Sequence, residues 1–533
     1  MSTYTINTSA DGLRYEAKQT SQGASVFIKN AVYAGILTDS ALTEVTDIDY
    51  PSKHTYTLAS LTSSGVTATA TTTGNNSLED GMIVSITGAN PSVYNGDWTI
   101  NATGSAIFTY TLGTATAPAS GTILAVGGFS TVPGVVYLHD YMVVQRTDGP
   151  IQNSANGDAS SWNALSFITP EKEPSNPVVI AKVLDAVASF KEWDTQFFID
   201  GAIPAPASFL VSADAYYLKL GCASADSLVE FDGGIVWMSK RDNLQRSREI
   251  HVLNGYTPKK ISDASVERIL NNDDLSEVHA LYLSTAGHQF YVLTLVSSEI
   301  TIVYDFNTGF WYEWNKLTPG TTQTLYALSQ EDGVATAIQP AHGLNDGDPV
   351  TIAGANQSGY NGLQDNISVV DANTFTFPVD EDTVSPATGT ATATGYMSSY
   401  YPIVAYATYQ NLDLGLGKSD GVIYSFDVDS YQDDGDPIDV KCRLPNWNGG
   451  TPHNKVVNRG QVVGDQVDAN VMVRYSDDDY QTYSTYRPQN LNVPTSKLTR
   501  LGMTQKRGYE FRHTGNTEFR ADSWDQEQTV EIL

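Results

Sequence analysis

Residues 289–314 read QFYVLTLV, SSE, ITIVYDF, NTG and FWYEW, and this stretch decides the fold class. Three apolar runs of five to eight residues are separated by short segments of turn-forming residues. In the second run Ile300, Ile302 and Tyr304 share one face, because side chains along a strand alternate with a period of two. The stretch therefore predicts an antiparallel meander of three short strands.

Short apolar runs separated by turn-forming residues also occur upstream of this meander. SLVEF (227–231), IVWMS (235–239) and EIHVLNGY (249–256) form a second set, and VVYLHDYMVV (135–144) reads as a hairpin. Short aromatic-rich meanders without a strict sequence period are typical of the blades of a β-propeller, and a long β-sandwich is the rival fold. We predict an all-β chain, a six-bladed β-propeller, whose best helical segment is SVERIL (265–270) with Asp263 as a possible cap.

Composition narrows the class of protein. The chain has 533 residues, enough for several domains or one large closed architecture, and no apolar run approaches the length that crosses a bilayer. Its start, MSTYTINTSADGLRYEAK, lacks the features of a secretory signal, so we expect synthesis in a cytoplasm. Two cysteines cannot build a disulfide framework. A net charge of −30 disfavours nucleic-acid binding through a broad basic face.

One phrase occurs twice. TGANPSVYNG (87–96) returns as AGANQSGYNG (353–362), and twelve identities surround the pair at one fixed offset, from Leu78 and Leu344 onward. The phrase predicts a strand, a Gly-Ala-Asn turn, a tyrosine anchor, an Asn-Gly turn and a further strand. Each copy is therefore expected to be a small β-barrel module of about sixty residues, inserted into a loop of a larger scaffold.

These observations give a domain plan. Residues 1–60 form the first part of the propeller scaffold, 61–126 the first inserted module, 127–331 the central scaffold, 332–396 the second module and 397–533 the C-terminal scaffold. Neither module contains a lysine or an arginine, so neither can clamp phosphates.

The sequence contains no complete motif for phosphate binding, calcium binding or hydrolysis. Gly417-Lys418-Ser419 lacks the first glycine of a phosphate-binding loop, since Leu412 stands there, and a turn is favoured instead. Asp427 and Asp429 are spaced as in a calcium loop, but Tyr431 and Gln432 replace a ligand and the turn glycine. HExxH and GxSxG do not occur, and paired carboxylates are common in so acidic a chain. We predict no catalytic, cofactor-binding or metal-binding residue and no cofactor.

Two features lie near the C-terminus. YSDDDYQTY (475–483) resembles the Asp-box turn of propeller blades at Ser476, Asp478 and Thr482, and an ordinary acidic β-turn is the equal alternative. Residues 441–520 carry twelve basic residues against seven acids, a net charge of +5. This asymmetry favours head-to-tail contact between identical subunits, and a mixed surface without a partner is the alternative.

Short phrases of the scaffold resemble the packaged-DNA stabilisation proteins, the tail nozzles of short-tailed phages. The pattern comprises Trp162, Ala164 and Phe167; Trp193, Thr195 and Phe197; Gly221-Cys222-Ala223 with Ser227; Asp232-Gly233 with Trp237; Tyr256, Pro258 and Ile261-Ser262; and Leu501-Gly502 with Arg507. Ala207-Ser208-Phe209 departs from the family's usual Pro-Phe pair. The two modules resemble a small β domain first described in ubiquitin-activating enzymes, but neither holds a cysteine, so no thioester chemistry transfers.

The resemblance implies a structural virion protein of a bacteriophage (podovirus) tail, not an enzyme. Such propellers assemble as a homohexameric ring below the portal, contact portal or adaptor and other tail proteins, and extend the DNA channel without inserting into a membrane. They retain packaged DNA until ejection, and an acidic channel wall would repel its phosphates. The alternatives are a carbohydrate-active or glycan-binding propeller, sialidase-like or a tail depolymerase, and a bacterial adhesin.

Overall fold

The computed structural model describes residues 16–20, 25–38, 41–231, 234–241, 248–285, 287–364, 367–410, 412–418, 421–494 and 496–530. Strands dominate these ranges, and α1 (Ala264–Asn272) is the one α-helix in them. Within the same residues, no helix is long and apolar enough to cross a membrane. The chain divides into two compact units, Met1–Tyr282 and Leu283–Leu533, called unit 1 and unit 2.

Besides the seven-stranded sheet of module 1, the described residues of unit 1 form four antiparallel sheets, each built mainly from strands that follow one another in the chain. The first contains β1 (Glu16–Gln19), β2 (Val26–Lys29), β3 (Ala34–Leu37) and β4 (Leu42–Glu44). The second contains β12 (Val136–Leu138), β13 (Tyr141–Gln145), β14 (Ile151–Ala155) and β15 (Asp158–Ile168). The third contains β16 (Pro177–Val183), β17 (Ala186–Lys191), β18 (Thr195–Asp200) and β19 (Leu210–Ser212). The fourth contains β20 (Gly221–Cys222), β21 (Val229–Phe231), β22 (Gly234–Lys240), β23 (Arg248–Asn254) and β24 (Thr257–Lys260).

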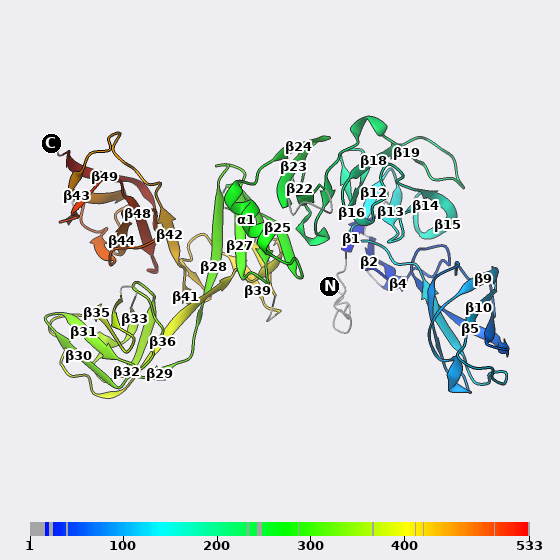
Figure 1. Cartoon of the computed structure of the whole chain (residues 1–533), viewed down its shortest axis with the longest axis horizontal. Coiled ribbons are helices and arrows are strands. Elements are labelled where there is room, and N and C mark those ends of the chain that lie inside the picture. Colours follow the sequence, from blue (N-terminus) through cyan, green and yellow to red (C-terminus); the bar gives the residue numbers. More distant parts are fainter. Residues whose placement is uncertain are drawn as a thin grey trace. The chain divides into compact units, whose positions relative to one another are not determined.

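Each sheet packs face to face on the next through a shared apolar core. Phe27 and Tyr50 pack with Trp162 between the first and second sheets, and Tyr50 and Trp162 are 4.9 Å apart between ring centroids. Phe190 meets Trp237 between the third and fourth sheets. The first strands β1, β12 and β16 lie next to one another (Figure 1). In a β-propeller, the blades are short sheets that pack face to face, and their first strands converge on a common centre. The sheets of unit 1 follow this arrangement.

The helix α1 follows β24 and confirms the expected helical segment. Asp263 is its N-cap, and its carboxylate accepts hydrogen bonds from the backbone N–H groups of Ser265 and Val266 at 2.9 Å. Val266 and Leu270, one turn apart, are its buried residues. The helix is therefore a surface element attached to the fourth sheet by one apolar stripe.

The two modules have corresponding strand pairing, except that the single strand β5 of module 1 corresponds to two strands, β29 and β30, in module 2. The sheet that contains residues 61–126, the expected module 1, starts before these bounds and consists of β5 (Lys53–Ser64), β6 (Thr67–Thr72), β7 (Ile83–Thr87), β8 (Gly96–Thr99), β9 (Asn101–Gly104), β10 (Ile107–Thr111) and β11 (Leu124–Gly128). Module 2 consists of β29 (Gln323–Thr324), β30 (Ala327–Glu331), β31 (Val334–Ile338), β32 (Val350–Ala355), β33 (Gly362–Gln364), β34 (Ser368–Asp371), β35 (Thr374–Pro378) and β36 (Gly389–Tyr400). Each encloses its own apolar core, and that of module 1 also takes in Tyr56 and Leu58.

The repeated phrase closes one loop in both modules. The Asn95 side chain accepts a hydrogen bond from the Ala89 N–H and donates one to the Ala89 carbonyl, both at 2.9 Å, and Asn361 does the same to Ala355. Next to each asparagine a fully buried tyrosine, Tyr94 or Tyr360, donates its hydroxyl hydrogen to a distant carbonyl. The asparagine side chain thus satisfies a backbone N–H and a carbonyl that would otherwise need a neighbouring strand. Both modules need this asparagine, which explains why the phrase is repeated.

The glycine of the phrase is required by space as well as by its backbone angle. Gly88 has φ +78°, and a Cβ there would lie 2.1 Å from the Thr122 carbonyl oxygen; Gly354 has φ +79°, with a distance of 2.2 Å to the Thr390 oxygen. Gly81 also has a positive φ, +85°, but faces open space. The two strands of each module therefore approach at a point that only glycine allows.

Unit 2 contains the meander expected from residues 289–314. It is formed by β26 (His288–Leu295), β27 (Ile300–Asp305) and β28 (Trp311–Pro319), with β25 (Val278–Thr285), where the units divide, beside β26. Phe290 pairs with Asp305 and Tyr304 with Trp311, so the expected register of consecutive hairpins is present. A three-stranded sheet follows module 2, with β37 (Ile403–Tyr409), β38 (Leu412–Gly417) and β39 (Ile423–Phe426).

The end of the chain forms two sheets over one core, called the C-terminal sandwich. One sheet contains β42 (Val440–Arg443), β44 (Asn470–Ser476), β45 (Arg487–Asn490) and β48 (Gly508–His513). The other contains β43 (Lys455–Gly464), β46 (Leu498–Thr499), β47 (Met503–Thr504) and β49 (Ala521–Val530). Val457 and Val462 of the second sheet pack with Val473 and Phe511 of the first. The assignment of residues 397–533 to the propeller scaffold stays a prediction.

The close approach of backbone at Gly88 can be tested by substitution. Gly88→Ala is expected to destabilise module 1 by about 3 kcal/mol, because the new methyl group meets a carbonyl at a strained angle. Gly81→Ala is the matched control and should cost about 1 kcal/mol from the backbone angle alone. Hydrogen exchange of β7 and β11 measures both; equal effects would show that the close approach is absent.

Candidate functional site

The first strands of the sheets in unit 1 surround a small cavity, called the hub cavity. It has a volume of about 320 Å³, and its lining includes Glu16, Lys18, Ile180, Glu230 and Ala280. Five strands, β1, β12, β16, β21 and β25, lie at or beside this lining. This convergence is where a propeller would hold a ligand or open a channel.

Ion pairs fill the walls of the hub cavity. The buried Lys29 Nζ lies 3.1 Å from the Glu16 carboxylate and donates to the Val132 carbonyl at 2.9 Å. Glu16 also accepts a hydrogen bond from the Gly134 N–H at 2.7 Å, which ties β1 to the second sheet. On the other side Lys18 and Glu230 pair at 2.9 Å and tie β1 to the fourth sheet. The charges therefore hold the blades together.

The size of the hub cavity excludes passage of DNA through it. Its volume holds about ten water molecules at roughly 30 Å³ each. The major groove of B-DNA alone is about 12 Å wide. At Gly134 (φ +95°) a Cβ would lie 1.9 Å from the Ile180 carbonyl oxygen, so the strands already touch there. The hub cavity is therefore no passage for a duplex.

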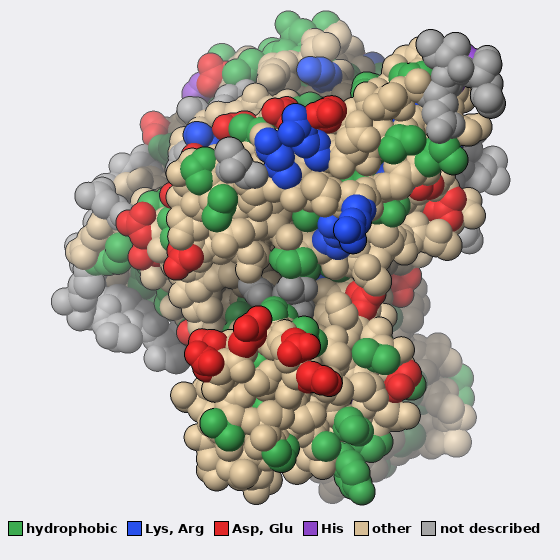
Figure 2. All heavy atoms as spheres, turned by 90° about the vertical axis from the view of Figure 1, so that its left-hand side faces the viewer, with side chains coloured by type: hydrophobic (Ala, Val, Ile, Leu, Met, Phe, Trp, Pro, Cys, Tyr) green, Lys and Arg blue, Asp and Glu red, His purple; other side chains and the backbone are tan. Residues whose placement is uncertain are grey.

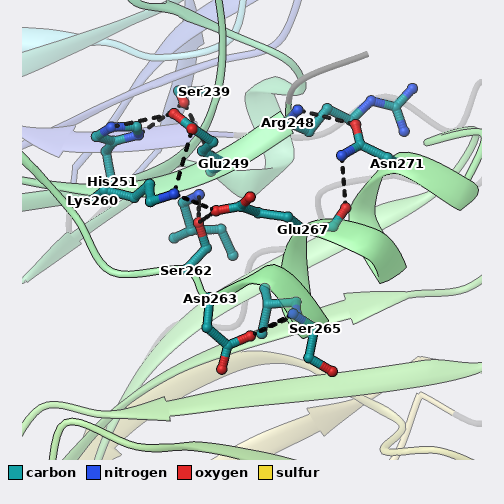
Figure 3. Close-up of polar contacts among 12 residues, drawn as sticks. Ser239, Arg248, Glu249, His251, Lys260, Ser262, Asp263, Ser265, Glu267 and Asn271 are labelled. Carbon is teal, nitrogen blue, oxygen red and sulfur yellow. Dashed lines mark hydrogen bonds and ion pairs between the residues drawn. The ribbon is translucent and has the colours of Figure 1, made fainter.

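A serine, a histidine and a glutamate come together on β22 and β23. The Ser239 hydroxyl lies 2.9 Å from His251 Nδ1, and His251 Nε2 lies 3.8 Å from a Glu249 carboxylate oxygen (Figure 3). Ser239 has no exposed surface and donates its hydrogen bond to the Glu249 carbonyl. Burial lowers the pKa of His251 and outweighs the opposite effect of Glu249. A substrate cannot reach this hydroxyl, so the trio is a structural network.

The same network attaches α1. Lys260 Nζ lies 3.6 Å from Glu249 and 2.7 Å from Glu267 on the helix (Figure 3). Arg248 donates to the carbonyls of Leu270 and Asp273 at the C-terminal end of the helix. An arginine at this end satisfies free carbonyls and complements the helix dipole. Sequence reasoning missed this network because its members are spread over three strands, β22, β23 and β24, and the helix α1.

The basic segment 441–520 forms much of the C-terminal sandwich, and Figure 2 shows the face on which several of its lysines and arginines gather. At its centre the fully buried Glu510 accepts hydrogen bonds from Arg443, at 2.5 Å, from Arg474, at 2.7 Å, and from the Tyr486 hydroxyl, at 2.5 Å. Burial opposes ionisation, but the hydrogen bonds of Tyr486 and Arg443 and the charge of Arg474 hold the pKa of Glu510 below its ordinary value. One carboxylate thus joins β42, β44 and β48.

Arg512 continues this row toward module 2. Its guanidinium pairs with Asp439 at 2.7 Å, donates to the Gly347 carbonyl and lies 3.5 Å from Asp348. Gly347 also packs on Tyr486, because a Cβ there would meet its ring at 2.6 Å. The repeated Asp-Gly turn of module 2 is therefore bound by an arginine of the sandwich.

Most of the other basic residues of the segment also have acidic partners. These pairs are Lys441 with Asp439, Arg459 with Glu527, Lys506 with Asp479, Arg507 with Asp477, and Arg520 with Asp465. Most basic side chains of the segment are thus already paired with acids, and two of those acids, Asp439 and Glu527, lie outside residues 441–520. Charge alone does not single out this segment as the face that meets another subunit.

A sialidase needs arginines that bind the substrate carboxylate and a tyrosine nucleophile. Arginines and a tyrosine do lie together in the C-terminal sandwich, but they do not form an open site. Tyr486 and Arg512 are buried, and Arg443 and Arg474 share the charge of Glu510. Burial and the hydrogen bond to Glu510 raise the pKa of Tyr486. A substrate carboxylate would have to displace Glu510 from both arginines. The sequence indicated the arginines and missed the glutamate that binds them.

The remaining motifs are turns. Asp478 accepts hydrogen bonds from the Thr482 hydroxyl and N–H and from Ser476, which lower its pKa to about 2. This Asp-box-like turn lies between β44 and β45 of the sandwich. Asp427 binds the Asp429 N–H, Lys418 follows β38, and Ser419 lies outside the described residues. Among the residues described, no three His, Cys, Asp or Glu side chains are arranged to hold a metal ion.

Glu510 supplies a test of the sandwich. Glu510→Gln should destabilise it by about 3–5 kcal/mol, because removing the carboxylate leaves two arginines unpaired beside a buried amide. Glu527→Gln is the control, since its pair with Arg459 is half exposed and contributes less than about 1 kcal/mol. Urea unfolding followed by hydrogen exchange in β44 and β48 compares them.

The pKa of Glu510 also predicts a dependence on pH. A carboxyl whose pKa is lower in the folded than in the unfolded state stabilises the fold above its unfolded pKa of about 4.3, and this contribution disappears as the pH falls through the folded value. Hydrogen exchange in β48 between pH 6 and pH 3 should show stability lost at the acid end. The loss should be smaller in Glu510→Gln; an identical acid profile in both proteins would contradict this assignment.

Solved structures that are similar to the chain share only about 10% of its sequence. The phage phi92 endosialidase aligns over 79% of this chain and 64% of its own, with a TM-score of 0.17. Dihydro-heme d1 dehydrogenase NirN aligns over 90% and 76%, with a TM-score of 0.26. The extracellular domain of BT4673 from B. thetaiotaomicron aligns over 94% and 71%, with a TM-score of 0.23. At such scores these likenesses say nothing of function, and no curated protein matches the chain.

A family model does match. Residues 84–331, which include module 1 from β7 onward and most of unit 1, match the family described as bacteriophage P22 Gp10, beta-propeller. The match agrees with the strand-dominated structure and with its face-to-face meanders, and it confirms the all-β, β-propeller class. It supports the resemblance to the phage DNA-stabilisation family and, with it, a structural protein of a bacteriophage.

Proposed function

We propose that this chain is a tail protein of a short-tailed phage, in which copies assemble as a nozzle or hub below the portal. The ring extends the DNA channel, retains the packaged genome and lets it pass at ejection. The match of residues 84–331 to the P22 Gp10 family carries the proposal. The partners of the chain would be further copies in a hexamer, the portal or adaptor, and other tail proteins. The chain would be made in the host cytoplasm and become part of the virion.

The small size of the hub cavity supports a channel made between copies. A cavity of about 320 Å³ whose lining includes the ion-paired Lys18 and Glu230 leaves no room for a duplex. A ring of propellers, by contrast, encloses a hole whose width depends on the number of copies. Each copy brings a net charge of −30, so walls built from this chain repel phosphates and let DNA slide.

The inserted modules fit a peripheral role. Residues 61–126 and 332–396 contain no lysine or arginine, so they have no means of binding DNA phosphates. Each has its own core and can be carried in a loop without disturbing the scaffold. We expect them to contact other tail parts or host glycans.

Catalysis is not part of the proposal. The carbohydrate-active alternative requires an open site, and the arginine and tyrosine cluster of the sandwich is neutralised by Glu510 and partly covered by module 2. The Ser239 hydroxyl is likewise closed to solvent.

The mass of the purified protein tests the proposal. We expect native mass spectrometry to find six copies of the 57.7 kDa chain, alone or after addition of portal complex, with a central hole in electron micrographs. A stable monomer in both conditions would contradict the ring. Release of sugar from sialylated or capsular glycans by that monomer would favour the carbohydrate-active alternative.

A further inference from the structure

A second hollow, in unit 2, is unused by the proposed function. It has a volume of about 670 Å³ and lies against β39, the start of β37, Lys316 of β28, and the loop that carries β40 (Gln432–Asp433) and β41 (Asp436–Pro437). This volume falls within the range of about 300–1,000 Å³ typical of ligand sites. We call it the acidic hollow.

One wall of the acidic hollow is apolar. Ile403 is buried at its base, Phe426 is half-buried, and Ile423 and Val428 are 66% and 63% exposed. Large aliphatic side chains left in water beside a hollow mark interaction sites more often than single exposed residues elsewhere do. This wall could cover the hydrocarbon part of a long side chain.

The other wall is acidic. Asp427, Asp433 and Asp434 line the hollow, and Lys316 is the one basic residue in its lining. In the part of unit 2 that the structure describes, these three aspartates form no ion pair. Burial raises the pKa of Asp433, Lys316 opposes this, and Asp436 adds to it. Burial thus disfavours the charged form of Asp433, and a further cation placed beside Asp433 and Asp434 would favour the charged carboxylates.

We propose that the acidic hollow receives an arginine or lysine side chain of a partner protein, with its charged end at Asp433 and Asp434 and its stem on Ile423 and Phe426. Only a long basic side chain combines a cation with an apolar stem, which matches both walls. The proposal rests on the proposed function for the partner, a neighbouring virion protein that meets this strongly acidic chain.

A small probe tests the acidic hollow in the full chain. N-acetyl-L-arginine amide should bind at millimolar concentration in saturation-transfer NMR, and N-acetyl-L-citrulline amide, of the same shape but without charge, should not. Asp433→Asn combined with Asp434→Asn should weaken binding at least about fivefold. Asp380→Asn with Asp382→Asn, in an exposed turn of module 2, is the matched control and should leave binding unchanged.

A second variant guards against loss of folding. Ile423 is well exposed, so Ile423→Ser should keep the fold and still weaken the arginine probe about twofold, through the lost stem contact. Equal binding of the two probes, or unchanged binding in both hollow variants, would overturn the inference.

The mass measurement separates this inference from the proposed function. If the ring forms but the arginine probe does not bind, the hollow is not a basic-residue site and the nozzle proposal stands. If the probe binds through Asp433 while the chain stays monomeric with portal present, the hollow is a binding site and the ring is wrong.

Discussion

The structure depends on one constraint: a short antiparallel sheet with two apolar faces is stable only when both faces are covered. In unit 1 each sheet meets this need by packing on the next, with Phe27 and Trp162 in one interface and Phe190 and Trp237 in another. Because the first strands then converge, their charged residues must pair. Glu16 is at the centre of this pairing, since it accepts from Lys29 and from the Gly134 backbone.

The modules are stabilised in a different way. Each has an apolar core of its own. The residues that the two copies share have a geometric role, since Asn95 and Asn361 imitate a strand partner and Gly88 and Gly354 sit under a carbonyl. Trp98 and Gln364 differ in kind, yet both donate to the carbonyl of the anchoring tyrosine. The residues that are identical in the two modules are therefore those that fix the backbone geometry.

Charge has two roles in this molecule. Inside the C-terminal sandwich, arginines surround single acids and act as cross-links between strands, as Glu510 and Asp439 show. The whole chain has an excess of acid, and such an excess repels phosphates and attracts basic groups. A count of charges along the chain does not distinguish paired from unpaired side chains. For this reason the sequence suggested that residues 441–520 contact another subunit, although most of their basic side chains are already paired within the sandwich.

The sequence by itself determined the meander at 289–314, the cap at Asp263 and the strands that the repeated phrase forms twice, because these depend on local alternation, turn chemistry and repetition. It could not give the convergence of β1, β12 and β16 or the meeting of Glu510 with Arg443 and Arg474. Those contacts join residues far apart in the chain, and no local pattern encodes which strand faces which. Whether a charged side chain is a cross-link, a turn or a free surface group was decided only by the tertiary structure, since burial and partners set its energy.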